Sequence, residues 1–90
     1  MLDDDMRRRR IRVRAWRRGL REMDILMGRF VDARVETLPA QALDELETLL
    51  DLPDAAVFRW LSGAEQPPAE RNTPLLRQII AFHTHDGPIH

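Results

Sequence analysis

Apolar residues recur along most of the chain at intervals of three and four residues, the spacing that places them on one face of a helix. The clearest stripes lie between residues 22 and 36, between 39 and 50, and between 74 and 83. One stretch alternates apolar residues (Ile11, Val13 and Ala15) with arginines, as a β-strand could. No second strand is available to pair with it. The pattern therefore predicts an all-α chain.

Glycine and proline divide this pattern into five helices. Gly19 is expected to end a first helix over about residues 6–18, because glycine adopts the left-handed conformation of a helix end without a steric penalty. A second helix covers about residues 22–36, a third begins at Pro39, a short fourth ends at Gly63, and a fifth runs from Thr73-Pro74 to about residue 83. We expect one compact five-helix bundle over residues 1–90, with about 1–6 and 86–90 flexible.

The same spacing predicts which side chains form the core. The first helix would contribute Ile11 and Ala15, with Trp16 or Leu20 as further candidates. The remaining helices would contribute Met23, Leu26, Met27, Phe30, Val31, Leu43, Leu46, Leu49, Leu50, Val57, Phe58, Trp60, Leu61, Leu75, Leu76, Ile79, Ile80 and Phe82. Trp16 lies among arginines, so its indole could instead be half exposed at an interface.

Composition narrows the functional classes. The chain has 90 residues and no cysteine, which excludes disulfides, thiolate metal sites and a cysteine nucleophile. No apolar run approaches the roughly 20 residues that span a bilayer. The N-terminus lacks the apolar stretch of a signal peptide, and Asp3-Asp4-Asp5 is unlike an acid-poor mitochondrial presequence. We therefore expect an intracellular protein without a membrane segment, cytoplasmic if the source is bacterial.

Charge is distributed unevenly along the chain. Residues 1–34 carry 11 arginines and 6 acids, whereas residues 35–90 carry 3 arginines and 9 acids, so their net charges are +5 and -6. The twelve residues 7–18 hold eight arginines and no acid. These arginines would form a patch attractive to an anionic partner unless the acidic half of the fold pairs with them.

Residues 17–24 read Arg-Arg-Gly-Leu-Arg-Glu-Met-Asp, and this octet lies where the first predicted helix stops and the second begins. Arg18, Gly19 and Glu22 match an R-G-x-x-E signature. The octet resembles the motif of the FAD assembly factors of succinate dehydrogenase, called succinate dehydrogenase assembly factor 2 in eukaryotes. The stretch from Leu52-Pro53-Asp54 to Phe58-Arg59-Trp60-Leu61 is similar to a second segment of that family. The resemblance covers about residues 10–83.

The resemblance implies a five-helix bundle and a chaperone-like function. Such a factor binds the flavoprotein subunit of succinate dehydrogenase and promotes covalent attachment of its FAD. The flavoprotein supplies the histidine nucleophile, so the factor is not an enzyme and holds no FAD stably itself. The fumarate reductase flavoprotein is a second client that the sequence leaves open. The signature implies Arg18, Gly19 and Glu22 as partner-binding residues, and we expect their neighbours Trp16, Arg17, Arg21 and Asp24 to take part.

The residue types of the octet suit protein docking. Arginine offers a planar fork for carboxylates and carbonyls, and glutamate accepts from amides or arginines. Gly19 has no side chain, so another backbone can approach it closely. If the octet is a docking surface, the side chains of Arg18 and Glu22 should be largely exposed, whereas burial in an internal network would indicate a structural turn. We expect a monomer in the free state.

Other functions receive less support from the sequence. His83, His85 and His90 lack further ligands at metal-site spacing, and no serine-histidine-acid arrangement or glycine-rich phosphate motif is present. The arginine run and the helical fold leave a nucleic-acid-binding protein as one alternative. A helix-turn-helix reader, however, carries its basic residues on its second helix, and the rest of this chain is acidic. A generic protein-interaction module, in which the octet is only a turn, is the other alternative.

Overall fold

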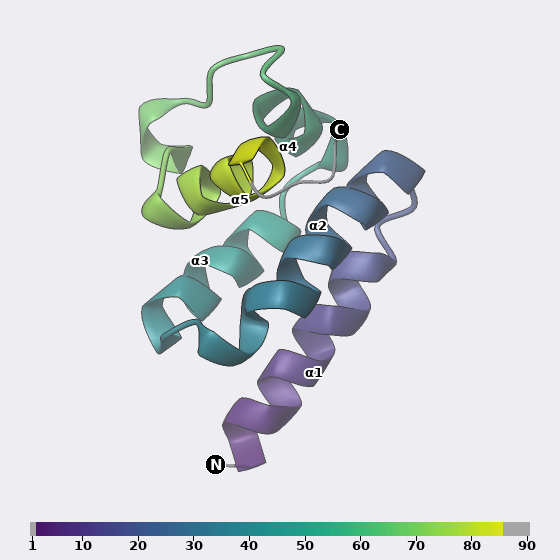
Figure 1. The fold of residues 1–90 in the computed structure, drawn as a ribbon, viewed down its shortest axis with the longest axis vertical. Coiled ribbons are helices and arrows are strands. Elements are labelled where there is room, and N and C mark those ends of the chain that lie inside the picture. Colours follow the sequence, from purple (N-terminus) through teal and green to yellow (C-terminus); the bar gives the residue numbers. More distant parts are fainter. Residues whose placement is uncertain (1, 86–90) are drawn as a thin grey trace.

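The computed structural model describes residues 2–85 as a bundle of five α-helices (Figure 1). Every regular element among these residues is helical, so the all-α prediction is confirmed. Two 3-10 turns, η1 (Val35–Thr37) and η2 (Ala69–Arg71), lie between α-helices. The α-helices are α1 (Leu2–Trp16), α2 (Arg21–Arg34), α3 (Ala40–Leu50), α4 (Asp54–Ser62) and α5 (Pro74–His85).

The first helix differs from its predicted limits at both ends. It begins at Leu2, so residues 2–6 are its first turns, and it ends at Trp16. The early start has a physical reason, because Asp4 and Asp5 lie in the first turns of the helix, near the positive end of its dipole, where negative charge is favourable. The predicted flexible segment 86–90 lies outside the described residues, as does His90.

The two N-terminal helices form an antiparallel hairpin along the long axis of the molecule (Figure 1). Ile11 and Ala15 of α1 are fully buried. Gly28 of α2 lies directly beneath the indole of Trp16, and a Cβ at this position would overlap that ring. Trp16 itself is 40% exposed and Leu20 is 37% exposed, so neither belongs to the core. Trp16 therefore covers the outside of the hairpin.

Helices α3, α4 and α5 close the core from the other side. Pro39 and Pro53 occupy the positions immediately before α3 and α4, so α3 begins one residue after the start predicted at Pro39. Gly63 ends α4 with a positive φ of 85°, which glycine tolerates without strain. The backbone N–H of Leu76 donates to the Thr73 hydroxyl oxygen at 3.2 Å, which confirms the predicted N-cap of α5.

Most of the predicted core is confirmed. The buried side chains are Ile11, Ala15, Met23, Met27, Phe30, Val31, Val35, Leu38, Ala42, Leu43, Leu46, Leu49, Leu50, Val57, Trp60, Leu75, Leu76 and Ile79. Phe58, Leu61, Ile80 and Phe82 pack against this core but remain partly exposed, as does Leu26. Trp60 is buried, and its indole N–H has no hydrogen-bond partner among the described residues.

No helix in residues 2–85 combines the length and the apolar character that a bilayer span requires.

Candidate protein-docking site

The octet forms the connection between α1 and α2, and its backbone turns at Gly19. Gly19 has a φ of +93°, in the left-handed region that favours glycine, but α1 already ends at Trp16, so Gly19 turns the connection and does not itself end the helix as predicted. Leu20 is extended and precedes α2, which begins at Arg21. The N–H of Asp24 then donates to the carbonyl of Leu20 at 3.0 Å, which closes the first turn of α2.

The side chain of Arg18 points into the fold, contrary to the prediction that it is exposed. It is 13% exposed, and its Nη2 lies 2.8 Å from the carboxylate of Asp54. Its Nε donates to the same Asp54 oxygen at 2.9 Å, and its Nη2 donates to the carbonyl of Leu50 at 2.6 Å. Arg18 therefore belongs to an internal network, the arrangement expected of a structural turn.

This network joins three helix ends. Leu50 is the last residue of α3, where a carbonyl has no partner within its own helix. Asp54 is the first residue of α4, so its carboxylate lies at the positive end of that helix. Arg18 satisfies both groups with one guanidinium and thereby fixes the octet to the α3–α4 turn.

Asp24 holds the same turn from the side of α2. Its carboxylate accepts the backbone N–H of Arg18 at 2.6 Å, and its side chain is only partly exposed. The two charged side chains at positions 18 and 24 thus act inside the molecule. They set the geometry of the turn, and residues 19–22 between them lie at the surface.

Apart from Leu20, the exposed residues of the octet are Arg17, Gly19, Arg21 and Glu22. Within residues 2–85, the side chains of Arg17, Arg21 and Glu22 make no hydrogen bond or ion pair. A side chain at Gly19 would point into open space, because no atom lies within 4 Å of the position that a Cβ would occupy. Two cations and one carboxylate therefore surround a bare backbone on a rigid turn, and we call these four residues the motif surface.

An apolar groove of about 340 Å³ adjoins the motif surface at Glu22. Its lining consists of Glu22, Ile25, Leu26, Phe58, Leu61 and Ser62, from α2 and α4. Sequence reasoning assigned Phe58 and Leu61 to the core and did not include Ile25 in any site. Ile25 could have indicated this groove, because it is an apolar residue of α2 that lies off the buried stripe of Met23, Met27 and Phe30.

Trp16 lies beside the turn, but its contacts are with α2. Its indole N–H donates to the carboxylate of Asp32 at 3.2 Å, and its ring covers Gly28. The predicted half-exposed indole is confirmed by its 40% exposure. Its proposed role in binding a partner stays a prediction.

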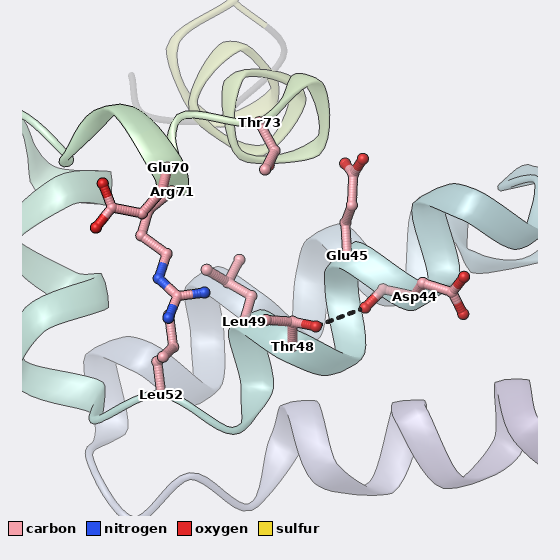
Figure 2. A pocket seen from close by; sticks show the side chains of 8 residues that line it. All are labelled: Asp44, Glu45, Thr48, Leu49, Leu52, Glu70, Arg71 and Thr73. Atoms are coloured by element: carbon pink, nitrogen blue, oxygen red, sulfur yellow. Dashed lines mark hydrogen bonds between the residues drawn. The ribbon is translucent and has the colours of Figure 1, made fainter.

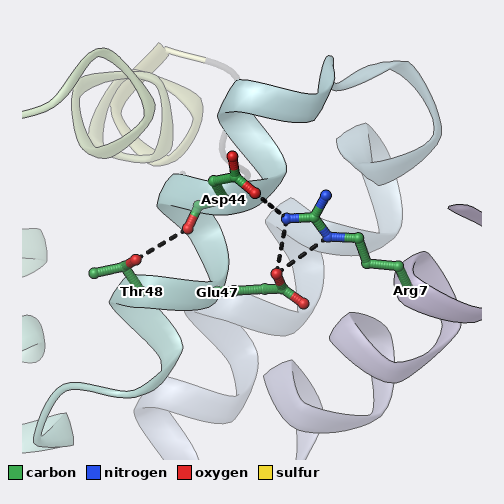
Figure 3. Close-up of polar contacts among 4 residues, drawn as sticks. All are labelled: Arg7, Asp44, Glu47 and Thr48. Atoms are coloured by element: carbon green, nitrogen blue, oxygen red, sulfur yellow. Dashed lines mark hydrogen bonds and ion pairs between the residues drawn. The ribbon is translucent and has the colours of Figure 1, made fainter.

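The N-terminal arginines divide into paired and unpaired groups. Arg7 hydrogen-bonds to Glu47 and also contacts Asp44 (Figure 3), and these hydrogen bonds raise the pKa of its guanidinium. Arg8 donates to the carbonyls of Val35 and Leu38. Arg12 pairs with Glu36, and Arg14 pairs with Asp51. The acidic half of the fold thus neutralises much of the predicted patch.

Another hollow lies away from the octet, between α3 and η2, and Figure 2 shows its lining. It measures about 200 Å³ and is lined by Asp44, Glu45, Thr48, Leu49, Leu52, Glu70, Arg71 and Thr73. Arg71 extends across it toward Leu52 (Figure 2). Residues 2–85 contain no cluster of three or more histidine, aspartate or glutamate side chains that could hold one metal ion. His83, a candidate ligand in the sequence, hydrogen-bonds instead through Nε2 to the carbonyl of Leu26 at 2.8 Å.

The sequence of the chain matches a known protein family. Residues 9–83 match the family model described as the flavinator of succinate dehydrogenase. The chain belongs to this family. The match includes the whole octet and extends into α5 as far as His83. The resemblance that the octet and the Phe58–Leu61 segment indicated is therefore confirmed. The family consists of assembly factors that are not themselves catalytic.

Curated relatives occur in bacteria and in eukaryotes. The chain is 43% identical over 74 residues to the FAD assembly factor SdhE of Acetobacter pasteurianus. The matched segment covers 82% of this chain and 68% of the relative. It is 33% identical to the FAD assembly factor SdhE of Coxiella burnetii over 70% of this chain and 77% of the relative. The mitochondrial succinate dehydrogenase assembly factor 2 of Dictyostelium discoideum is 27% identical, and the match covers 91% of this chain and 57% of that longer protein. No solved structure is significantly similar to the chain.

Proposed function

We propose that this protein binds the flavoprotein subunit of succinate dehydrogenase and promotes covalent attachment of its FAD. The docking surface would be the motif surface (Arg17, Gly19, Arg21 and Glu22) together with the adjoining apolar groove. Family membership supports the client, since the relatives are named as FAD assembly factors and as succinate dehydrogenase assembly factors. The observation that carries the docking surface is the contrast within the octet, where Arg18 is anchored inside and Glu22 is exposed.

The geometry suits docking because the turn is already ordered before a partner arrives. Arg18 and Asp24 hold the backbone on both sides of Gly19, so little conformational entropy remains to be lost on binding. A partner backbone can approach Gly19 closely, and its polar groups can bond to Glu22, Arg17 and Arg21. An apolar side chain of the partner can enter the groove of Ile25, Leu26 and Phe58 beside Glu22.

In this proposal the protein acts on its partner through orientation. The flavoprotein would carry both reacting groups, its bound FAD and the histidine that attacks it. Binding would hold the immature flavoprotein in a geometry in which these groups meet, and this lowers the entropic part of the barrier. The FAD belongs to the flavoprotein, and the assembly factor would hold none stably. The flavoprotein of fumarate reductase is a further client to test.

The bacterial relatives support action in the cytoplasm, on the flavoprotein before it joins its enzyme. We propose that the free protein is a monomer. The nucleic-acid alternative has less support than the sequence gave it, because Arg7, Arg8, Arg12, Arg14 and Arg18 are occupied by internal partners.

Binding can be tested with purified flavoprotein that has been produced in cells lacking this protein. The wild-type chain should form a complex that elutes as one species on size exclusion. Glu22→Ala should weaken the complex by about tenfold or more, as expected when a charged hydrogen-bond partner is lost at the centre of an interface. Glu70→Ala is the matched control, since Glu70 is an exposed glutamate of η2, far along the chain from the octet, and should leave affinity unchanged.

The absence of any complex with the wild-type chain would contradict the proposed client. Equal affinities for Glu22→Ala and Glu70→Ala would retain the client but remove the motif surface as the docking site.

A further inference from the structure

The outward side of α1 carries charge and apolar surface that the motif does not account for. Met6 is 53% exposed and Val13 is 48% exposed, although both are large apolar residues on a regular helix. They line a shallow hollow of about 430 Å³ together with Arg9, Arg10 and Arg14. We call Met6, Arg9, Arg10 and Val13 the outer face of α1.

Periodicity places these residues together and leads to the octet. Met6, Arg10 and Val13 follow one another at intervals of four and three, so they lie along one stripe of α1. The next position in this series is Arg17, which directly follows the helix and belongs to the motif surface. The outer face of α1 is therefore continuous with the proposed docking site.

The arginines of the outer face differ from their neighbours on the same helix. Arg7, Arg8, Arg12 and Arg14 bond to acids or carbonyls of other elements. Arg9 and Arg10 are exposed and have no partner within residues 2–85. The fold thus leaves two cations, with an apolar side chain on each side of them along the helix, available to another molecule.

The composition of this face indicates its partner. Two such faces would bring arginine against arginine, so pairing with a second copy of the chain is electrostatically unfavourable. A helix that lies in a membrane surface needs a broad face of large apolar residues, and among the described side chains that line this hollow only Met6 and Val13 are apolar. A phosphate backbone would satisfy the arginines and leave the apolar side chains without contacts. A protein surface with an apolar centre and acidic flanks complements both parts.

We propose that the outer face of α1 is a second contact area for the flavoprotein, and that it receives an acidic surface with an apolar centre. This inference rests on the proposed function. The contact would extend the interface from the turn along the helix, with Arg9 and Arg10 paired to carboxylates and with Met6 and Val13 covered. Complementary charge would chiefly raise the association rate and make binding depend on salt.

The test measures association rates and affinities of the full chain with the flavoprotein at several salt concentrations. The charge-reversal pair Arg9→Glu/Arg10→Glu should weaken binding by about tenfold or more at low salt and reduce its salt dependence. Met6→Ser/Val13→Ser should weaken binding about three- to tenfold with an unchanged salt dependence, because it removes only apolar contact. All of these side chains are exposed, so thermal unfolding should be close to wild type.

The matched control is Arg71→Glu/Arg77→Glu, which makes the same change of net charge at η2 and α5. It should alter affinity less than about twofold. An equal loss for this control would show a general charge effect and would overturn the inference. Undiminished binding of Arg9→Glu/Arg10→Glu, with weakened binding of Glu22→Ala, would also overturn it while leaving the proposed function intact.

Two further probes separate the sources of anionic charge. Vesicles containing phosphatidylserine and a mixed-sequence DNA duplex should each bind the wild-type chain and Arg9→Glu/Arg10→Glu with no large difference. If the arginine pair matters for vesicles or DNA but not for the flavoprotein, the outer face serves a membrane or a nucleic acid and the inference is wrong. Failure of the wild-type chain to bind the flavoprotein would overturn the proposed function and this inference with it.

Discussion

Arginines lie on both the inward and the outward sides of residues 7–18, but their surroundings are opposite. On the inward side, Arg18 bonds to Asp54 and to the carbonyl of Leu50, and Arg7 bonds to Asp44 and Glu47. On the outward side, Arg9, Arg10 and Arg17 are exposed without partners among the described residues. Arginine content alone therefore does not define a binding surface. The partners that the fold supplies decide which arginines stabilise the molecule and which remain free to bind another.

The octet repeats this division on a smaller scale. Arg18 and Asp24 make contacts within the fold, whereas Gly19, Arg21 and Glu22 face outward. Three residues define the R-G-x-x-E signature, yet they have different physical tasks. The arginine positions the turn, the glycine allows its backbone conformation and close approach, and the glutamate presents a charge. Substitutions at these positions should therefore separate stability from binding.

The largest loss of stability should follow removal of the inward arginine. Arg18→Ala leaves Asp54 and the Leu50 carbonyl without their partner at positions that are largely buried, so it should lower the free energy of unfolding by about 2–3 kcal/mol. Urea unfolding measures this loss. Combining Arg18→Ala with Asp54→Ala should cost less than the sum of the single changes, because the two side chains contact each other. Simple additivity, or a loss below about 0.5 kcal/mol, would show that the network does not hold the turn.

An intermediate loss is expected at Gly19. Alanine at this position must adopt a φ of +93°, which costs about 1–2 kcal/mol for a residue with a Cβ. Gly19→Arg should lose a similar amount of stability, because the added side chain points into open space. Only Gly19→Arg should also abolish flavoprotein binding by occupying the space of the partner backbone. Comparing the two variants at a temperature where both are folded separates strain from obstruction, and equal binding would rule out close approach at Gly19.

The smallest change in stability should follow removal of the outward charges. Arg9→Ala/Arg10→Ala and Glu22→Ala should each alter the free energy of unfolding by less than about 0.5 kcal/mol, because the side chains are exposed and make no hydrogen bond or ion pair within residues 2–85. The same urea titration that is used for Arg18→Ala measures them. A loss comparable with that of Arg18→Ala would erase the distinction between the two sides.

Local signals allowed much of the fold to be predicted. Gly63 and the Thr73-Pro74 pair act through their own backbone preferences, and the structure confirms both of them. Gly19 adopts the positive φ that glycine favours, although α1 ends at Trp16 before it. The start of α1 was placed too late, because the acidic residues that precede the arginines were not recognised as favourable at a helix N-terminus. The packing of the Trp16 indole over Gly28 could not be predicted, because Gly28 lies on another helix and gave no apolar signal.

The candidate site was predictable only in part for the same reason. Glu22 could be placed at the surface from its position in the first turn of a helix. The inward direction of Arg18 depends on Asp54, which is 36 residues away in sequence, and on how the α3–α4 turn packs against the octet. The groove likewise needs α2 and α4 to meet beside Glu22. Such contacts follow from tertiary packing and leave no local pattern.

We propose that Glu22, the exposed glutamate of the octet, is needed for flavin attachment in the partner flavoprotein. It is tested most directly by the fluorescence of covalently bound flavin on the denatured flavoprotein after incubation with FAD and each variant. We expect strong fluorescence with the wild-type chain and with Glu70→Ala, and a clear reduction with Glu22→Ala although that variant remains folded. Fluorescence with Glu22→Ala that equals the wild-type level would contradict the proposed role of this glutamate. Flavin attachment that proceeds equally well without the protein would contradict the proposed function.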